Sequence, residues 1–167
     1  TIKRCAVNHF SKASLDAILQ QPNVKTKNGH RDLFYMILLY DTGARDREIL
    51  DLHPADVITN TKAPYIIIRG KGNKVRTIPI MDETVLHYKS YMKRFHMDPA
   101  DTATYLFYTT IHGIKHAMSD DNVARFITKY ATLARTICLE VPVHVTPHMF
   151  RHSRALHLYQ KGVPLPL

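Results

Sequence analysis

The sequence predicts a mainly helical α+β domain that carries one small antiparallel β-hairpin. Several stretches place apolar residues three and four positions apart, which is the spacing of one face of a helix. The middle of the chain changes this period, because the β-branched run 65–68 precedes a glycine-rich turn and a second such run. The 167 residues, 45% hydrophobic and 22% charged, are enough for one globular domain with a sizeable core.

Three helices are expected before the hairpin. Ser11 is a typical N-cap residue and begins a helix that ends near residue 21. A second helix runs over about 30–42, and Gly43 is the residue type that most often follows a helix C-terminus. A short helix over about 45–52 then ends before a proline.

The rest of the chain alternates strands and helices. Residues 65–68 and 75–80 are predicted strands, joined by the turn Gly70–Lys74. The remaining predicted elements are a helix over 82–95, a short extended piece at 105–108, a helix that begins at 119–121, and a last helix capped by Thr146 with Pro147 in its first position.

The chain is strongly basic, with 23 Lys+Arg against 14 Asp+Glu and a formal net charge of +9. Such a surplus repels itself unless the partner is a polyanion, which favours nucleic acid over the competing choice, an acidic membrane surface. We expect no membrane insertion, because no apolar run is long enough to span a bilayer. The two cysteines, Cys5 and Cys138, form no close pair, which argues against a disulfide scaffold and is typical of a reducing cytoplasm.

The first segment that could carry chemistry is Thr42-Gly43-Ala44-Arg45-Asp46-Arg47-Glu48. It places Arg45 at a helix N-terminus, where an arginine can bind a phosphate through two hydrogen bonds and where the helix dipole also attracts anions. Glu48 can brace the Arg45 guanidinium or cap the helix. The alternative interpretation is a surface turn with a local Arg–Glu pair.

The second segment is the hairpin Gly70-Lys71-Gly72-Asn73-Lys74-Val75-Arg76. Its glycines allow the backbone and a lysine to approach a phosphate chain closely. Lysines in turns are more often simply solvated, so this segment by itself is weak support for a binding site.

The third segment is Thr146-Pro147-His148-Met149-Phe150-Arg151-His152-Ser153. His148 and Arg151 are three residues apart and share a helix face, whereas Met149 and Phe150 project to the other side and can anchor the helix in the core. A histidine beside a fixed cation suits proton transfer at a phosphate. The alternative is a capped helix with a solvated basic face.

Together the three segments offer two arginines, a lysine and a histidine, the set needed for phosphoryl transfer without a metal. The transition state of that reaction gathers negative charge, which fixed cations can stabilise in place of an ion. The carboxylates are not clustered, so we expect no metal and no other cofactor. No nucleophile is apparent among these segments.

The order and spacing of the three segments resemble the motifs of the tyrosine recombinase (phage integrase) family over essentially the whole chain. The resemblance implies the helical catalytic-domain fold of that family and metal-free cleavage and rejoining of DNA through a 3′-phosphotyrosine link. It implies that Arg45 and Arg151 clamp the phosphate, that Lys71 protonates the leaving 5′ oxygen, that His148 assists proton transfer, and that Glu48 supports them. We expect further DNA contacts from Lys74, Arg76, Arg47 and His152.

The chain departs from the family pattern in three respects. Residues 1–167 are expected to be a single catalytic-domain fragment without the N-terminal core-binding domain and without the C-terminal segment that carries the nucleophilic tyrosine. Arg47 stands close to Arg45 and can compete for its role. Tyr159, the tyrosine nearest to the last motif, is expected to pack rather than react.

The family implies double-stranded DNA as the partner and a tetramer of full-length protomers on it, whereas this fragment is expected to be a monomer without DNA. Three other functions remain open at this point. They are a non-catalytic DNA-binding module derived from a recombinase, a type IB topoisomerase, and a zinc protein that uses the histidines four residues apart, His112 with His116 or His144 with His148 and His152.

Overall fold

The computed structural model describes residues 9–161, apart from the side chains of residues 159 and 160. Its helices are α1 (Lys12–Leu19), α2 (Lys27–Thr42), α3 (Asp46–Leu50), α4 (Asp82–Phe95), α5 (Asp120–Arg135) and α6 (Pro147–Gln160). Its strands are β1 (Val57–Ile58), β2 (Tyr65–Arg69), β3 (Val75–Pro79), β4 (Tyr108–Ile111) and β5 (Ile114–Ala117). Two 3₁₀ turns, Pro54–Asp56 and Lys71–Asn73, complete the order. The predicted mainly helical α+β class is therefore confirmed.

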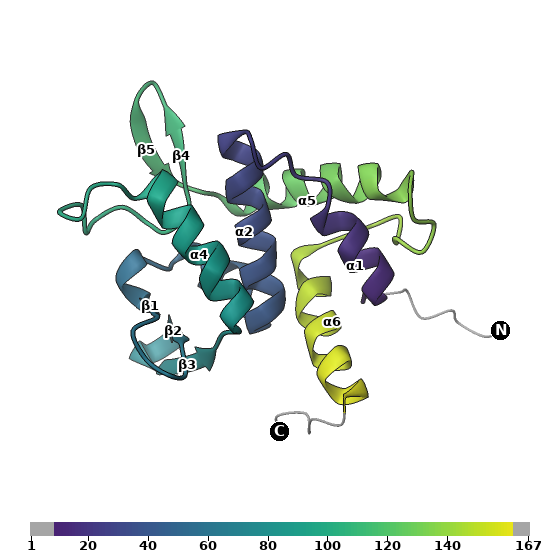
Figure 1. Ribbon diagram of the computed structural model, residues 1–167, viewed down its shortest axis with the longest axis horizontal. Coiled ribbons are helices and arrows are strands. Elements are labelled where there is room, and N and C mark those ends of the chain that lie inside the picture. Colours follow the sequence, from purple (N-terminus) through teal and green to yellow (C-terminus); the bar gives the residue numbers. More distant parts are fainter. Residues whose placement is uncertain (1–8, 162–167) are drawn as a thin grey trace.

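Helix α2 is the centre of the domain. Figure 1 shows it between α4 on one side and α6 on the other, and it packs against both. Phe34, Tyr35, Met36, Leu38 and Leu39 of α2 are almost completely buried, so this helix is apolar around most of its circumference. Helix α5 crosses the domain and packs against α1. The site elements α3 and α6 are thus both attached to one rigid central helix.

The main sheet is antiparallel with the strand order β1-β2-β3. Strands β2 and β3 pair from Tyr65 opposite Pro79 to Arg69 opposite Val75. Alternate residues of β2, Ile66 and Ile68, are buried, whereas β3 is exposed along nearly its whole length. The far end of this hairpin therefore projects from the core on an exposed edge strand.

Local signals fixed most element ends as predicted. Ser11 accepts a hydrogen bond from the Ser14 N–H, Ser119 accepts one from the Asn122 N–H, and Gly43 adopts φ +63° after α2. Helix α4 covers the predicted residues 82–95. Helix α2 begins three residues earlier than expected, because Thr26 caps it through the Gly29 N–H. The short helix α3 covers 46–50 rather than 45–52.

Two strand expectations were wrong or incomplete. The extended piece expected at 105–108 is mostly irregular, and a β4–β5 hairpin over Tyr108–Ala117 follows it instead. The turn of that hairpin contains two residues at positive φ, His112 at 50° and Gly113 at 78°, a pairing typical of two-residue hairpin turns. Strand β1, only two residues long, was also missed.

A buried polar group links α2 to α5 and to the segment after α4. The Asp32 carboxylate accepts hydrogen bonds from the Arg31 guanidinium at 2.9 Å and from the Tyr130 hydroxyl at 2.7 Å. Burial raises the pKa of Asp32 despite the neighbouring arginine. The Arg31 guanidinium also donates to the Tyr108 carbonyl at 3.4 Å.

Across 9–161, no helix is both long and apolar enough to cross a membrane.

Candidate active site

The turn between α2 and α3 fixes the position of Arg45. Gly43 reverses the chain in the left-handed region, Ala44 is buried, and Arg45 follows as the extended N-cap residue of α3. Helix α3 is held in the core by Ile49 and Leu50. The Arg45 side chain is exposed, so a rigid turn presents a free guanidinium to solvent.

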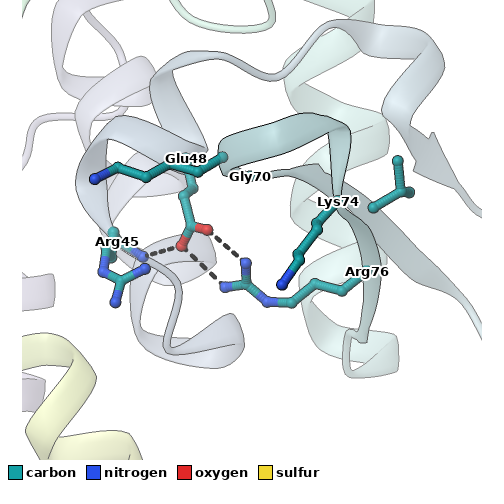
Figure 2. A pocket seen from close by; sticks show the side chains of 7 residues that line it. Arg45, Glu48, Gly70, Lys74 and Arg76 are labelled. Carbon is teal, nitrogen blue, oxygen red and sulfur yellow. Dashed lines mark hydrogen bonds and ion pairs between the residues drawn. The ribbon is translucent and has the colours of Figure 1, made fainter.

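Glu48 caps α3 and also binds an arginine on a distant strand. Its Oε1 accepts the Arg45 backbone N–H at 2.9 Å, as the capping expectation required. The alternative role, bracing the Arg45 guanidinium, is not observed. Its two carboxylate oxygens instead accept hydrogen bonds from Arg76 of β3, at 2.5 and 3.0 Å. Figure 2 shows Glu48 between Arg45 and Arg76, with Lys74 reaching toward the same space.

The cap also changes what the α3 N-terminus can do. Asp46 and Glu48 both lie in the first turn of this five-residue helix, so carboxylates already occupy the positive end of its dipole. These carboxylates weaken the attraction of the helix dipole for another anion, so the main contribution of α3 is the placement of Arg45.

The β2–β3 hairpin carries Lys71 in a short 3₁₀ turn that the Gly70 N–H closes by donating to the Lys74 carbonyl at 2.8 Å. Gly72 adopts φ +68° with open space around it. Lys71 and Lys74 are both exposed. The glycines thus let the turn reverse tightly and leave its lysines free at the surface.

A pocket of about 890 Å³ opens between α3 and this hairpin. It is lined by Arg45, Glu48, Gly70, Lys71, Lys74, Val75 and Arg76. The lining holds four cationic side chains and one carboxylate, which leaves a surplus of positive charge in one concave surface. A phosphate is the ligand best suited to such a surface.

Helix α6 brings the third motif toward this pocket. Met149 and Phe150 are buried and anchor the helix, as predicted, and Phe10 packs edge-on against Phe150 with 5.0 Å between ring centroids. His148 is exposed at the N-terminal end of α6. Arg151 is half-buried, and within 9–161 its buried Nη1 has no hydrogen-bond partner. An unpaired buried guanidinium nitrogen is costly, and an anionic ligand would satisfy it.

The electrostatic neighbours of His148 show that α6 lies close to Arg45. Burial, followed by the charges of His152, Arg151 and Arg45, lowers the pKa of His148. Its Nε2 lies 2.7 Å from Nε2 of His152, a distance that requires one nitrogen to donate and the other to accept. Both effects disfavour the charged form of the His148 imidazole.

The residues expected to add DNA contacts differ in how free they are. Lys74 lines the pocket, and His152 bonds to His148. Arg76 is bound to Glu48, and Arg47 points away to Asp120, with 2.7 Å between Nη2 and the carboxylate. Arg45 therefore lines the pocket, whereas Arg47 does not and pairs with Asp120 of α5.

Three residues that hold α6 in place were not identified from the sequence. Ser153 Oγ accepts the Phe10 N–H at 2.7 Å and donates to the Met149 carbonyl at 2.6 Å. Arg154 lies 3.3 Å from the buried Asp41 carboxylate. His157 contacts the Tyr40 hydroxyl and the Phe10 carbonyl with its two ring nitrogens. The available signal was that Ser153 and Arg154 stand four and three positions before His157 on α6, just after Arg151, and so share one side of the helix with it.

His148 and His152 of the zinc hypothesis contact each other on α6, whereas the other three histidines lie outside that helix. His112 lies in the β4–β5 turn, His116 lies on β5, and His144 precedes α6, outside the helix as expected from Pro147. Over residues 9–161, no three or more His, Cys, Asp or Glu side chains come together as metal ligands would. Cys138 is half-buried with a free thiol, whereas Cys5 lies outside the described residues.

Comparison with known proteins agrees with this arrangement. A family model described as the phage integrase family matches residues 8–167. The chain is 31% identical over 150 residues to tyrosine recombinase XerD of Staphylococcus epidermidis, a match that covers 89% of this chain and 48% of the relative. It is 33% identical over 140 residues to tyrosine recombinase XerA of Pyrococcus furiosus, covering 83% and 44%. The chain thus spans about half the length of these curated relatives.

Solved structures share the fold. The crystal structure of XerA recombinase matches with a TM-score of 0.76 at 21% identity, covering 98% of this chain and 54% of that one. XerH recombinase bound to its difH substrate matches with a TM-score of 0.74 at 22% identity, covering 96% and 46%. With the family model spanning all the residues that form the pocket and α6, this chain belongs to the phage integrase family of tyrosine recombinases.

Proposed function

We propose that this chain forms the catalytic domain of a site-specific DNA recombinase that cuts and rejoins double-stranded DNA without a metal. The observation that carries the proposal is the convergence of cations from three separate motifs. Arg45 and Lys71 line one pocket, and the pKa of His148 responds to both Arg45 and Arg151. Cations gathered in this way suit the charged transition state of phosphoryl transfer.

In the proposed reaction, a tyrosine oxygen attacks the scissile phosphorus and the 5′ oxygen of the next nucleotide leaves. Arg45 and Arg151 bind the non-bridging oxygens, and the phosphate satisfies the unpaired Arg151 Nη1. Lys71 donates a proton to the leaving 5′ oxygen. His148, neutral because its pKa is lowered, accepts the proton of the attacking tyrosine. Rejoining reverses these steps with a 5′-hydroxyl from another strand, so no external energy source is needed.

The nucleophile is proposed to be a tyrosine beyond Leu167 in the full-length protein. None of the tyrosines whose side chains the structure describes lines the pocket. Several have hydroxyls engaged elsewhere, as Tyr91 with the Leu106 carbonyl and Tyr130 with Asp32. Burial also raises the pKa of both phenols, which makes them harder to ionise to the nucleophilic phenolate. The Tyr159 side chain lies outside the described residues.

The proposed assembly is a tetramer of full-length protomers on DNA, with this fragment monomeric when DNA is absent. XerH recombinase was solved bound to difH, and the Tn1549 transposon integrase was solved in complex with circular intermediate DNA. The net charge of +9 supports binding to DNA by this chain as well.

The experiment that tests this function compares cleavage with binding in the full-length protein. Arg45→Ala and Arg151→Ala are each expected to lower the cleavage rate by at least about 100-fold while weakening DNA binding far less. Arg69→Ala is the matched control, because Arg69 is an exposed arginine of β2 that pairs with Asp56 outside the pocket. Unchanged cleavage in either site variant contradicts the proposed roles, and DNA binding without cleavage by the wild type identifies a non-catalytic binding module.

A further inference from the structure

The Glu48–Arg76 pair is the side-chain link between the hairpin that carries Lys71 and the turn that carries Arg45. Glu48 stands 28 positions before Arg76, yet both of its carboxylate oxygens contact the Arg76 guanidinium. The same Oε1 accepts the Arg45 backbone N–H. One carboxylate therefore connects β3 directly to the backbone of Arg45 (Figure 2).

Besides this pair, the hairpin is attached to the core through β2, which packs against α3 and buries Ile66 and Ile68. Strand β3 is an exposed edge strand, and among its residues Ile78 alone is half-buried. Among residues 9–161, the hydrogen bonds of the segment 70–75 stay within the β2–β3 hairpin. The position of Lys71 relative to Arg45 thus depends on the buried part of β2, on the twist of β2–β3 beyond it, and on the Arg76 contact.

The pair is stronger than an ordinary surface ion pair. The Glu48 side chain is only 10% exposed, and the hydrogen bond from Arg76 is the main cause that lowers the pKa of Glu48. Glu48 in turn raises the pKa of Arg76. Two parallel hydrogen bonds between a guanidinium and a carboxylate also fix orientation as well as distance. Glu48 thus takes up two of the N–H groups of the Arg76 guanidinium and holds this side chain toward α3.

We propose that Arg76 is a positioning residue, which with Glu48 latches the β2–β3 hairpin to α3 and so sets Lys71 at the leaving oxygen. This inference rests on the proposed function, in which Lys71 is the proton donor. It replaces the expectation that Arg76 contacts DNA directly. Arg45, Lys71 and Lys74 remain as the free cations among the residues that line the pocket.

The two roles for Arg76 predict opposite effects of a change at Glu48. If Arg76 only awaited a DNA phosphate, Glu48→Gln would release it and strengthen DNA binding. If the pair is a latch, Glu48→Gln and Arg76→Ala disturb the same contact and produce the same defect. A direct phosphate contact would also make the salt dependence of DNA binding less steep by about one unit in Arg76→Ala.

The chain contains a matched control pair on the same sheet. Asp56 accepts the His53 backbone N–H at 2.9 Å and pairs with Arg69 of β2, which repeats the arrangement of Glu48 with Arg45 and Arg76. These residues line no part of the pocket next to Lys71. Asp56→Asn and Arg69→Ala therefore remove a similar ion pair without releasing the latch.

The test measures single-turnover cleavage by the full-length protein on two DNA duplexes that differ at the scissile phosphate. One has the normal bridging 5′ oxygen, and the other has sulfur there. A thiolate leaves without being protonated, so cleavage of the sulfur duplex does not require a correctly placed proton donor. Lys71→Ala sets the scale, because it is expected to fail on the oxygen duplex and to recover on the sulfur duplex.

We expect Arg76→Ala and Glu48→Gln to lower cleavage of the oxygen duplex by about 10- to 100-fold and to recover nearly wild-type rates on the sulfur duplex. Arg76→Lys should retain part of the activity, and the Asp56 and Arg69 variants should cleave both duplexes normally. Tighter DNA binding by Glu48→Gln, or no sulfur rescue of Arg76→Ala while Lys71→Ala is rescued, overturns the latch. If Lys71→Ala itself is not rescued, the proposed role of Lys71 fails instead.

Discussion

Ser153 connects α6 to the start of the described chain, and replacing it with alanine tests how that helix is held. The Ser153 side chain is fully buried, and its Oγ is the partner of the Phe10 N–H. Phe10 is also fully buried, so its N–H cannot turn to water when the oxygen is removed. Ser153→Ala therefore leaves a buried donor unsatisfied.

The expected loss follows from two opposing terms. An unsatisfied buried donor costs about 1–3 kcal/mol, whereas alanine is a better helix former than serine by less than about 0.7 kcal/mol. We expect the free energy of unfolding to fall by about 1–2.5 kcal/mol. For a chain of this size that loss corresponds to a decrease in Tm of roughly 2–10 °C.

Urea unfolding of the wild type and variant measures the loss, with an unchanged m value as the sign that only stability has altered. Ser90→Ala is the matched control, because Ser90 is an exposed serine within α4 and carries the same change in helix propensity. Its stability should stay the same or rise by a few tenths of a kcal/mol. Equal effects of Ser153→Ala and Ser90→Ala would refute the reasoning.

Three further predictions concern the support of the site. Asp41→Ala removes the partner of Arg154 and orphans the Met81 N–H, so unfolding in urea should show a loss of about 3–5 kcal/mol, and a loss below about 1 kcal/mol contradicts the buried pair. Gly43→Ala places a side chain on a residue at φ +63° and should cost about 1–2 kcal/mol in the same assay because of backbone strain. The added Cβ would lie at an ordinary 3.8 Å from Arg154, so no clash adds to this cost. No loss of stability contradicts the strain. Lowering the pH should reduce Tm, because burial lowers the pKa of five histidines in the folded state and the unfolded chain takes up protons first, below about pH 6.5. A Tm that stays constant between pH 7.5 and 5.5 contradicts this prediction. The five histidines are His30, His87, His96, His148 and His157.

The sign of the pH effect has one opposing contribution. A histidine whose folded pKa is lowered contributes stability that is present at neutral pH and is lost as the pH falls through its unfolded pKa. Asp32 has a raised pKa and acts in the other direction, at lower pH, where carboxyl groups titrate.

Element ends could be predicted from the sequence because their causes are local. Ser11, Ser119 and Gly43 act through neighbours within four residues, so their spacing alone identifies the caps. The β4–β5 hairpin was missed because β5 is exposed on both faces and shows no alternation between apolar and polar residues. Its His112-Gly113 turn was the overlooked signal.

The candidate site residues could be proposed from the sequence, whereas their pairings could not. Arg45, Lys71, His148 and Arg151 each stand in a short motif whose residues are adjacent in sequence. The partners of Arg76 and Arg47 lie 28 and 73 residues away, so which arginine is free and which is committed depends on tertiary distances. The same reason explains why the sequence left two roles open for Glu48, capping α3 or bracing Arg45, and did not indicate its contact with Arg76.

The measurement that tests the central claim most directly is covalent capture on nicked DNA in the presence of EDTA. The full-length protein is incubated with duplexes that carry its target sequence and trap the cleaved strand, and the linked peptide is identified after proteolysis. We predict an adduct on a tyrosine that follows α6, formed equally with and without EDTA and lost in Arg45→Ala and Arg151→Ala. An adduct that requires a divalent metal, or intact DNA binding with no adduct at all, would contradict a metal-free strand-exchange site built from these residues.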